Sequence, residues 1–545
     1  MARVLEIVLD VILCATDGAR TGGRASGGGP GGAAAALAKA FASALPQLVA
    51  LRGGRVTTVT FDRDAALARA GWRIAVEAHG GRQRVAVSQR EMLTPGITVL
   101  TSHFEAPLKA GVLAASLFDT APEPFRTALA AAGEPVPAAT LHGERRRWQW
   151  LRDGIEAEVV LDAALHDPDR VSESESPRYL HELRVRAPWP EGADAAPVVD
   201  LLFACAHDLV DVAPAGLPAF VRMTDASDRA AAGCLAGDGE AVHAQAIDLA
   251  GARTARAAFV EIGRNISAQW FGNDAGVRDS ARPEFIHQMR VSQRRLRTAM
   301  RIFSRWQDET WTARIKPDLK WLGHLLGDAR DRDVFVDSTL PTLAAADAAD
   351  AAQASQAAAA RWDALRAEAD AARSAAHARV REALASPRYA HAALAWLQWL
   401  AVLARREEAS SAMGARERSL RKHARKQARR FYGRLTAMPK LTAIDEASRH
   451  LVRINGKYLR YTLEFFAPIM SQSTCTDTLR ALTRLQGVLG DGNDIVVALR
   501  LLEELDAEPY QLGFVRGWRA AASRSAAVEG ERLLREMRQP KLQGD

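Results

Sequence analysis

The sequence predicts an α+β protein of two domains, in which a mainly antiparallel β domain precedes an all-α domain. The length of 545 residues exceeds that of one ordinary domain. Short β-branched runs separated by glycine turns occupy the first part of the chain, and helical periodicity of Ala, Leu, Arg and Glu dominates from residue 251. We therefore expect a β domain over residues 1–220, a linker over 221–250 and a helical domain over 251–538.

Two hairpins are the clearest local signals in the β domain. Gly80-Gly81 and Asp153-Gly154 each separate two alternating apolar segments, which is typical of a tight turn between paired strands. The other elements expected along the chain are a strand over 4–14, a mobile glycine-rich loop over 17–32, a helix over 33–52, strands over 56–61 and 179–186, and long helices over 344–384.

Charge is divided unevenly between the two halves. Residues 1–250 carry 24 Lys and Arg against 31 Asp and Glu, a net charge of −7, whereas residues 251–545 carry 48 against 34, a net charge of +14. The helical half is therefore the candidate for binding an anionic partner. Glu6 and Asp10 interrupt the apolar N-terminus, which argues against a signal peptide, and no uncharged apolar run reaches the roughly 18 residues of a membrane span. The four cysteines lie far apart without CxxC spacing, so a reduced cytoplasmic protein without a zinc site is expected.

The helical half contains an internal repeat. HQMRVSQRRLRTAMRIF begins at His287, and HLVRINGKYLRYTLEFF begins at His450, 163 residues later. At the same offset, LGDARD from Leu326 matches LGDGND from Leu489. Two separate motifs that share one offset indicate a duplicated helical unit, and hence two bundles related by an approximate two-fold axis.

Each copy of the first motif places cations on one face of a helix. At 100° per residue, five basic positions of the first copy fall within an arc of about 80° along about 21 Å of helix. These positions are His287, Arg290, Arg294, Arg297 and Arg301. The second copy has His450, Arg453, Lys457 and Arg460 in the same arc, but Glu464 replaces the fifth cation. The opposite side of the first copy is expected to face the core and holds Met289, Leu296, Met300 and Phe303.

Like charges four residues apart, as in Arg290 and Arg294, destabilise an isolated helix. The arrangement therefore predicts an anion-binding face, or else internal pairing with carboxylates such as Asp328, Asp331, Asp491 and Asp494. A third basic stretch, over residues 417–434, places Arg421, Arg425 and Arg429 on one helix face. Alone it is equally typical of a solvated or loosely nucleic-acid-binding helix, and beside the other two faces it is interpreted as a further wall of the same site.

The motifs HxxRVxxRRLRxxxxxF, LGxxRDxDV and HxxRIxxKxLRYxLEFF together closely resemble the CHAD domain family, over about residues 251–538. The resemblance implies two four-helix bundles with pseudo-two-fold symmetry and a basic groove that binds inorganic polyphosphate. Carried over position by position, it implies polyphosphate contacts from His287, Arg290, Arg294, Arg297, Arg301, His450, Arg453, Lys457 and Arg460, with Lys320 and Arg330 as additional candidates. The chemistry agrees, because a linear cationic track suits a chain with about one negative charge per phosphate, and Arg binds phosphate oxygens bidentately.

The N-terminal half resembles the CYTH domain, a triphosphate tunnel fold, in fragments around Phe61-Asp62, Arg145–Arg147 and Gly154–Asp162. The ExExK metal and substrate motif of that family would begin at Glu6, but Val8 and Asp10 stand where its second Glu and its Lys would be. The loss of one Mg²⁺-binding carboxylate and the inversion of one charge predict a degenerate domain without catalysis, which serves as a scaffold or partner surface. The remaining acids are expected to be solvated strand residues or to form an acidic patch of Glu6, Glu156, Glu158, Asp162 and Glu182.

Together these features predict a protein that binds inorganic polyphosphate through a basic groove, associates with polyphosphate granules in the cytoplasm and is not an enzyme. Granule proteins are candidate partners, neither a cofactor nor a membrane is expected, and the oligomeric state stays open. One alternative is a divergent metal-dependent inorganic triphosphatase. Another is a general nucleic-acid-binding protein, against which the basic faces lack interleaved aromatic residues and the chain lacks a helix-turn-helix or zinc-finger signature.

Overall fold

The computed structural model describes residues 3–12, 30–108, 113–166, 179–232, 239–350, 356–412 and 419–544. The chain forms two compact units. The barrel unit consists of Met1–Glu240, Asp274–Ser280 and Ala383–Arg405, and the helical unit consists of Ala241–Asn273, Ala281–Glu382 and Arg406–Asp545. The predicted α+β class, with an antiparallel β domain followed by an all-α domain, is confirmed.

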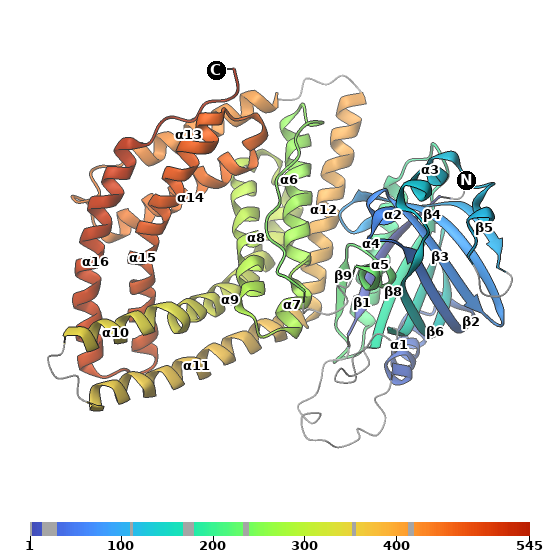
Figure 1. Ribbon diagram of the computed structural model, residues 1–545, viewed down its shortest axis with the longest axis horizontal. Coiled ribbons are helices and arrows are strands. Elements are labelled where there is room, and N and C mark those ends of the chain that lie inside the picture. The colour runs from blue at the N-terminus through green and yellow to red at the C-terminus, as the bar shows by residue number, and fades with distance from the viewer. Residues whose placement is uncertain are drawn as a thin grey trace. The chain divides into compact units, whose positions relative to one another are not determined.

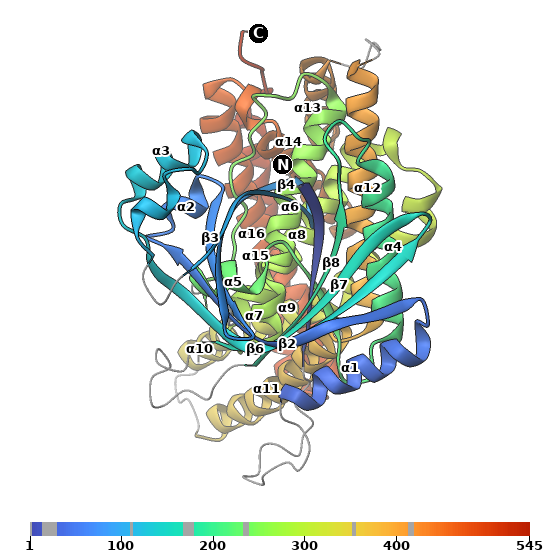
Figure 2. The same ribbon diagram turned by 90° about the vertical axis from the view of Figure 1, so that its right-hand side faces the viewer.

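The barrel unit is built on one antiparallel sheet (Figure 1). In the described residues its strands are β1 (Arg3–Val11), β2 (Leu48–Asp62), β3 (Trp72–His79), β4 (Arg82–Thr94), β5 (Ile97–Pro107), β6 (Val136–Arg152), β7 (Ile155–His166), β8 (Tyr179–Pro188) and β9 (Ala219–Arg222). They follow the order β5-β4-β3-β2-β6-β7-β8-β1-β9, and β1 also pairs with β5. This last pairing closes the sheet into the barrel that Figures 1 and 2 show.

Strand β1 closes the barrel because its two halves have different partners. Its first half, Arg3 to Glu6, pairs with β5, whereas its second half, Val8 to Val11, pairs with β9. Both predicted hairpins are confirmed: β3 pairs with β4 and β6 with β7. The turn residues Gly80, Gly81, Asp153 and Gly154 all have positive φ. Such turns match the right-handed twist of the strands that they join.

The helices of the barrel unit are α1 (Pro30–Ala44), α2 (Ala66–Arg69), the 3-10 turn η2 (Ala115–Phe118), α3 (Glu123–Ala132), α4 (Ala196–Val212), α5 (Ala226–Ala231) and α7 (Asp274–Asp279). The helix expected over 33–52 is wrong in its second part, because Leu48 onward pairs with β6 as strand β2. Residues 17–29 of the expected glycine-rich loop lie outside the described residues, and 30–32 belong to α1. The range expected to be a linker, 221–250, includes α5 and the end of β9.

The helical unit contains α6 (Ala255–Phe271), α8 (Pro283–Ile302), α9 (Lys316–Val334), α10 (Leu340–Asp350), α11 (Gln356–Leu384), α13 (Leu420–Thr436), α14 (Glu446–Phe465), α15 (Leu479–Glu504) and α16 (Pro509–Glu536). Helix α12 (Pro387–Ala412) is divided between the two units. A buried core joins α10, α11, α15 and α16 and includes Phe335, Trp362, Leu365 and Leu502.

The sequence repeat is reproduced element by element at its offset of 163 residues. Helix α8 maps onto α14 from its first residue to its last, and α9 and α15 begin at equivalent positions. The short turns between them also correspond, with η4 (Ser304–Trp306) matching η7 (Ala467–Ile469) and η5 (Trp311–Ile315) matching η8 (Thr474–Thr478). The duplication predicted from two motifs therefore extends through the intervening structure.

Candidate anion-binding site

Helices α8 and α14, which carry the two predicted basic faces, pack against each other in the helical unit. The predicted core stripe of α8 is confirmed, because Met289, Leu296 and Met300 are buried. Burial of this apolar side fixes the rotation of the helix about its axis. The basic side of α8 is thereby turned away from this core, and its residues are half-buried or exposed.

The charges of the two repeats act on one another, which shows that they converge. Burial, followed by repulsion from Arg453 and from Arg294 and Arg290 of α8, lowers the pKa of Lys457 to about 7. Burial and then repulsion from Arg290 and Arg294 also lower the pKa of Arg297. We call the cations that α8 and α14 bring together the cationic track: Arg290, Arg294, Arg297, Arg453, Lys457 and Arg460.

Some track residues bind groups of the protein itself. Arg290 Nη1 donates to the carbonyl oxygen of Gly327 at 2.6 Å and to Asp331 Oδ1 at 2.7 Å. Arg453 Nη1 donates to Asn493 Oδ1 at 2.9 Å, and Arg460 Nε lies 3.2 Å from Glu464 Oε1. Internal pairing, the alternative left open by the sequence, therefore applies to part of the track. The carboxylate of Asp328 instead binds two arginines outside the track, Arg332 and Arg379.

The rest of the track is not neutralised in this way. Arg294 hydrogen-bonds Tyr461, but its Nε is buried without a hydrogen-bond partner. In the part of the chain that the structure describes, neither Arg297 nor Lys457 forms a hydrogen bond or an ion pair with a carboxylate. Like charges brought together without counter-charges cost free energy, and a bound anion would remove this cost.

Glycines on α9 make room for the arginines of α8. A Cβ atom at Gly323 would lie 2.2 Å from Arg297 Nη2, so a larger residue there would displace this guanidinium from the position it occupies. A Cβ atom at Gly327 would lie 3.9 Å from the Arg290 guanidinium, which is ordinary contact. Helix α9 therefore forms one wall of the track, and it positions Arg297 through a missing side chain.

Further cations lie at one end of the track. Arg301 Nη1 donates to Tyr458 Oη at 3.0 Å, and its guanidinium lies 4.7 Å from the Tyr458 ring centroid. Burial, followed by repulsion from Arg434 and Arg301, lowers the pKa of Arg430 on α13. Sequence reasoning missed Arg430. Its position next to the buried Phe431, at the margin of the packed face of α13, is the signal that could have identified it.

Histidines occupy the other end. Burial, followed by repulsion from Arg330, lowers the pKa of His287 to about 4, and its Nδ1 is buried without a hydrogen-bond partner. Burial and the charges of Arg453 and Lys457 likewise lower the pKa of His450. Both imidazoles are therefore neutral at pH 7. Arg330, an additional candidate from the sequence, is close enough to His287 to act on its charge.

The other predicted residues have different surroundings. Arg421 donates to the carbonyl oxygen of Gln543 near the C-terminus. Arg429 and Lys320 are exposed on α13 and α9, and Arg425 is half-buried. Among the described contacts, none joins Arg421, Arg429 or Lys320 to the cationic track.

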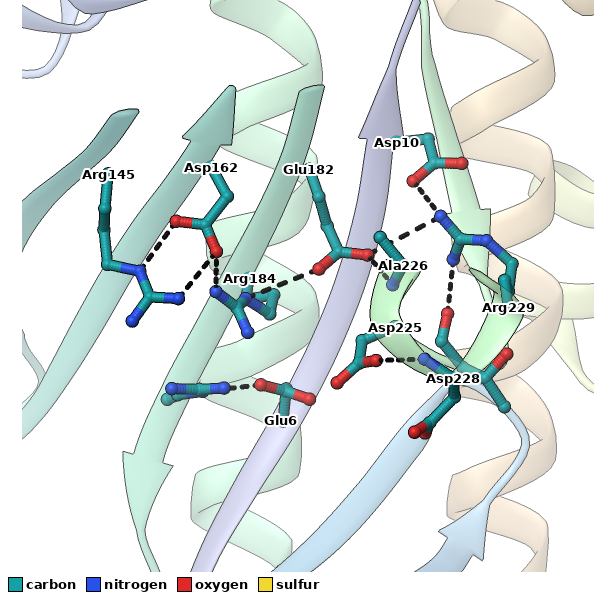
Figure 3. A network of polar contacts seen from close by, with 12 residues as sticks. Glu6, Asp10, Arg145, Asp162, Glu182, Arg184, Asp225, Ala226, Asp228 and Arg229 are labelled. Carbon is teal, nitrogen blue, oxygen red and sulfur yellow. Dashed lines mark hydrogen bonds and ion pairs between the residues drawn. The ribbon is translucent and has the colours of Figure 1, made fainter. Parts of the chain in front are cut away.

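A second concentration of charge lies inside the barrel, where Figure 3 shows arginines and carboxylates in alternation. Arg184 lies between Asp162 and Glu182, and Arg229 reaches both Asp10 and Glu182. The arginines of this network are Arg73, Arg90, Arg145, Arg184, Arg186, Arg222 and Arg229, and the acids are Glu6, Asp10, Glu77, Asp162, Glu182, Asp225, Asp228 and Asp274. We call it the barrel network.

Cations and acids nearly balance in the barrel network. Burial raises the pKa of Glu182 to about 8 in spite of Arg184, so this carboxyl group is protonated at pH 7 and neutral. The cavity that remains beside Arg145, Asp162 and Glu182 has a volume of about 20 Å³, room for about one water molecule. The expectation of solvated strand residues is wrong for Glu6 and Glu182, which are buried, whereas Glu156 is exposed.

The residues at the position of the expected metal motif do not fit Mg²⁺. Glu6 Oε2 accepts a hydrogen bond from Arg186 at 2.5 Å, and Asp225 Oδ2 accepts hydrogen bonds from Arg73 and Arg90 at 2.6 Å each. Burial alone would raise the pKa of Glu6, but Arg186 and Arg90 hold it below its usual value. In the described part of the chain, no group of three or more His, Cys, Asp or Glu side chains is arranged to hold a metal ion.

Comparison with known proteins assigns the helical unit. Residues 261–503 match the family model of the CHAD domain. The chain belongs to the CHAD-domain family, and the resemblance seen in the motifs is confirmed. The closed antiparallel barrel, the architecture that the second resemblance implied, is established by its own strand pairing.

Solved structures of other proteins are similar to parts of the chain. The CHAD domain from the plant Ricinus communis is 30% identical, with 56% of this chain and 99% of that chain covered and a TM-score of 0.47. PptA from Streptomyces chartreusis is 18% identical, covering 52% and 99%, with a TM-score of 0.37. HpAC1 from Hippeastrum, a putative adenylyl cyclase described as having a dominant triphosphatase activity, is 13% identical, covering 43% and 96%, with a TM-score of 0.27. No curated protein matches the chain.

A search of the described residues finds no helix with the length and apolar character needed to cross a membrane.

Proposed function

We propose that the helical unit binds inorganic polyphosphate along the cationic track and that the protein associates with polyphosphate granules. The observation that carries this proposal is the meeting of cations from both repeats with too few counter-charges, so that they lower one another's pKa. A partner with closely spaced negative charges would relieve this repulsion. The CHAD resemblance implies the same ligand.

The chemistry of the track suits phosphate more than a nucleic-acid base. Guanidinium groups bind phosphate oxygens bidentately and keep their charge at any physiological pH. Tyr461 is buried, and the ring of Tyr458 is covered by Arg301 and packs 5.6 Å from Phe431, measured between ring centroids. Neither ring offers a free face on which a base could stack. A phosphate polymer without bases is therefore the ligand that the track fits best.

We further propose that the barrel unit is not an enzyme. The cations that would neutralise a triphosphate are bound to carboxylates of the barrel network, and the carboxylates that would hold a metal are bound to those cations. The cavity of about 20 Å³ leaves no space for three phosphates. These observations favour a structural role over the divergent inorganic triphosphatase.

The track is tested by removing its unpaired cations without disturbing the fold. In the variant R297M/K457M, both long apolar stems are kept while two positive charges are lost. Retention on long-chain polyphosphate is expected to fall by about a hundredfold or more, since a hydrogen bond to a charged group is worth roughly 1.5–3 kcal/mol. The melting temperature without ligand is expected to rise, because repulsion between like charges is removed.

The matched control is R532Q/R535Q, which loses two charges from α16, where Arg532 pairs with the exposed Glu536 and the exposed Arg535 pairs with the buried Glu531. It is expected to retain polyphosphate as the wild type does, and excess duplex DNA should not displace the bound polymer. Wild-type retention by R297M/K457M, or an equal loss in the control, would refute the site.

A further inference from the structure

Two adjoining cavities lie beside the cationic track, between α14, α15 and α16. The inner cavity has a volume of about 250 Å³ and is lined in part by His450, Arg453 and Asn493. The outer cavity, of about 460 Å³, is lined by residues that include Arg516, Arg519 and Arg524 of α16. Glu446, Arg449 and Ser523 line both cavities. The two cavities therefore adjoin at these three residues, and the inner one borders the track at Arg453.

The outer cavity is strongly cationic. Four of its lining residues are arginines, and Glu446 is the single carboxylate among them. Glu446 binds Arg519, and Glu503 lies 3.1 Å from Arg516 in a pair whose side chains are at least half exposed. Ion pairs this exposed contribute little to stability, so a multiply charged anion can replace the carboxylates. Among the described residues, Arg524 has no hydrogen-bond or ion-pair partner.

Arg449 is held in place before any ligand arrives. Its Nη1 donates to the carbonyl oxygens of Leu441 at 3.2 Å and Ile444 at 2.8 Å, and its Nη2 donates to Ser523 Oγ at 3.2 Å. A cation fixed in this way loses little conformational entropy when it meets an anion. The wall shared by the two cavities is therefore preorganised.

One residue that lines both cavities differs between the repeats. At the offset of 163 residues, Arg449 corresponds to Ile286, which is buried in the first repeat. The cation that the two cavities share is thus a feature of the second repeat.

We propose that this outer cavity, which we call the lateral site, binds a short run of anhydride-linked phosphates. Arginines provide the bidentate donors that phosphate oxygens prefer. The linings of both cavities contain no Phe, Tyr or Trp on which a nucleotide base could stack, so a phosphate compound without a base is favoured. The ligand is either a free oligophosphate or the end of a polyphosphate chain whose remaining phosphates lie along the cationic track. The second of these ligands rests on the proposed function.

The test measures tripolyphosphate binding by calorimetry to the full chain with the track disabled by R297M/K457M. Adding R516Q/R524Q to this background is expected to weaken tripolyphosphate binding at least tenfold. The control pair R532Q/R535Q, which removes equal charge from the same helix, is expected to leave it unchanged. Circular dichroism verifies that each variant is folded. Either of two results overturns the lateral site. In the first, the R297M/K457M background does not bind tripolyphosphate. In the second, the R516Q/R524Q and control substitutions leave equal affinities.

A second arm separates the two sources of ligand in the R516Q/R524Q variant with an intact track. If chain ends occupy the lateral site, this variant binds open-ended polyphosphate more weakly than the wild type but binds chains with amidated ends equally well. If the ligand is a free oligophosphate, the two kinds of chain behave alike. Failure of the proposed function has a different signature, namely undiminished binding of long chains to R297M/K457M.

Discussion

At the scale of single residues, Lys457 shows how the track differs from an ordinary charged surface. A lysine in water is fully protonated at pH 7, but burial and the neighbouring arginines lower the pKa of Lys457 to about 7. About half of the molecules therefore carry a neutral amine at this pH without ligand. An anion placed beside the amine favours its charged form.

Polyphosphate binding is consequently expected to take up protons. At pH 8 the free protein holds Lys457 mostly neutral, and the bound polymer raises its pKa, so about one proton enters per site. The affinity should fall as the pH rises above 7, because protonating the amine then costs more. Calorimetry at pH 8 in buffers with different ionisation enthalpies measures the uptake.

The Lys457→Met variant should lose this buffer dependence. His287, with a pKa of about 4, stays neutral and does not imitate the signal. Equal proton uptake in the variant and the wild type would show that another group titrates.

At the scale of elements, the track depends on how closely α8 and α9 approach. Arg297 lies against the backbone of α9 at Gly323, where a Cβ would come within 2.2 Å of its Nη2. The glycine lowers the helix propensity of α9 by about 1 kcal/mol relative to alanine. Its presence is explained by the guanidinium that it accommodates.

Gly323→Ala is expected to stabilise α9 locally but to displace Arg297. Polyphosphate affinity should fall by about tenfold, the contribution of one hydrogen bond to a charged group. Gly327→Ala on the same face is the control, because its Cβ would lie 3.9 Å from the Arg290 guanidinium. Equal affinities of the two variants in a polyphosphate titration would contradict a positioning role for Gly323.

At the scale of the whole molecule, the two units differ in how far their interior cations are neutralised by carboxylates. The barrel network surrounds each interior arginine with carboxylates, whereas the cationic track leaves arginines and a lysine without them. An interior that is already neutral has little affinity for a further anion. Anion binding is therefore expected in the helical unit alone.

The full chain is accordingly expected to release no phosphate from tripolyphosphate with Mg²⁺ or Mn²⁺ above the rate without enzyme. Glu6→Gln, which keeps the shape of the side chain, and Glu6→Ala should both leave that rate unchanged. A colorimetric phosphate assay measures it. Metal-dependent release that either variant abolishes would establish the divergent triphosphatase instead.

Much of the architecture was already determined by the sequence. Turn chemistry located both hairpins, because Gly80-Gly81 and Asp153-Gly154 adopt positive φ that most residues avoid. Helical periodicity located the basic face of α8 opposite Met289 and Leu296, and the offset of 163 residues located α14. These signals are local, since they depend on neighbours within one strand, turn or helix.

Which charges are neutralised was decided by the tertiary structure alone. Arg290 and Arg297 lie on the same basic face in the sequence pattern. In the structure, Arg290 pairs with Asp331 on α9, whereas Arg297 lies against Gly323. Glu6 was recognised as part of a damaged motif, but only the closed barrel brings Arg90 and Arg186 to it. Coulomb interactions and burial depend on distances between elements remote in the chain, and periodicity within one element carries no information about those distances.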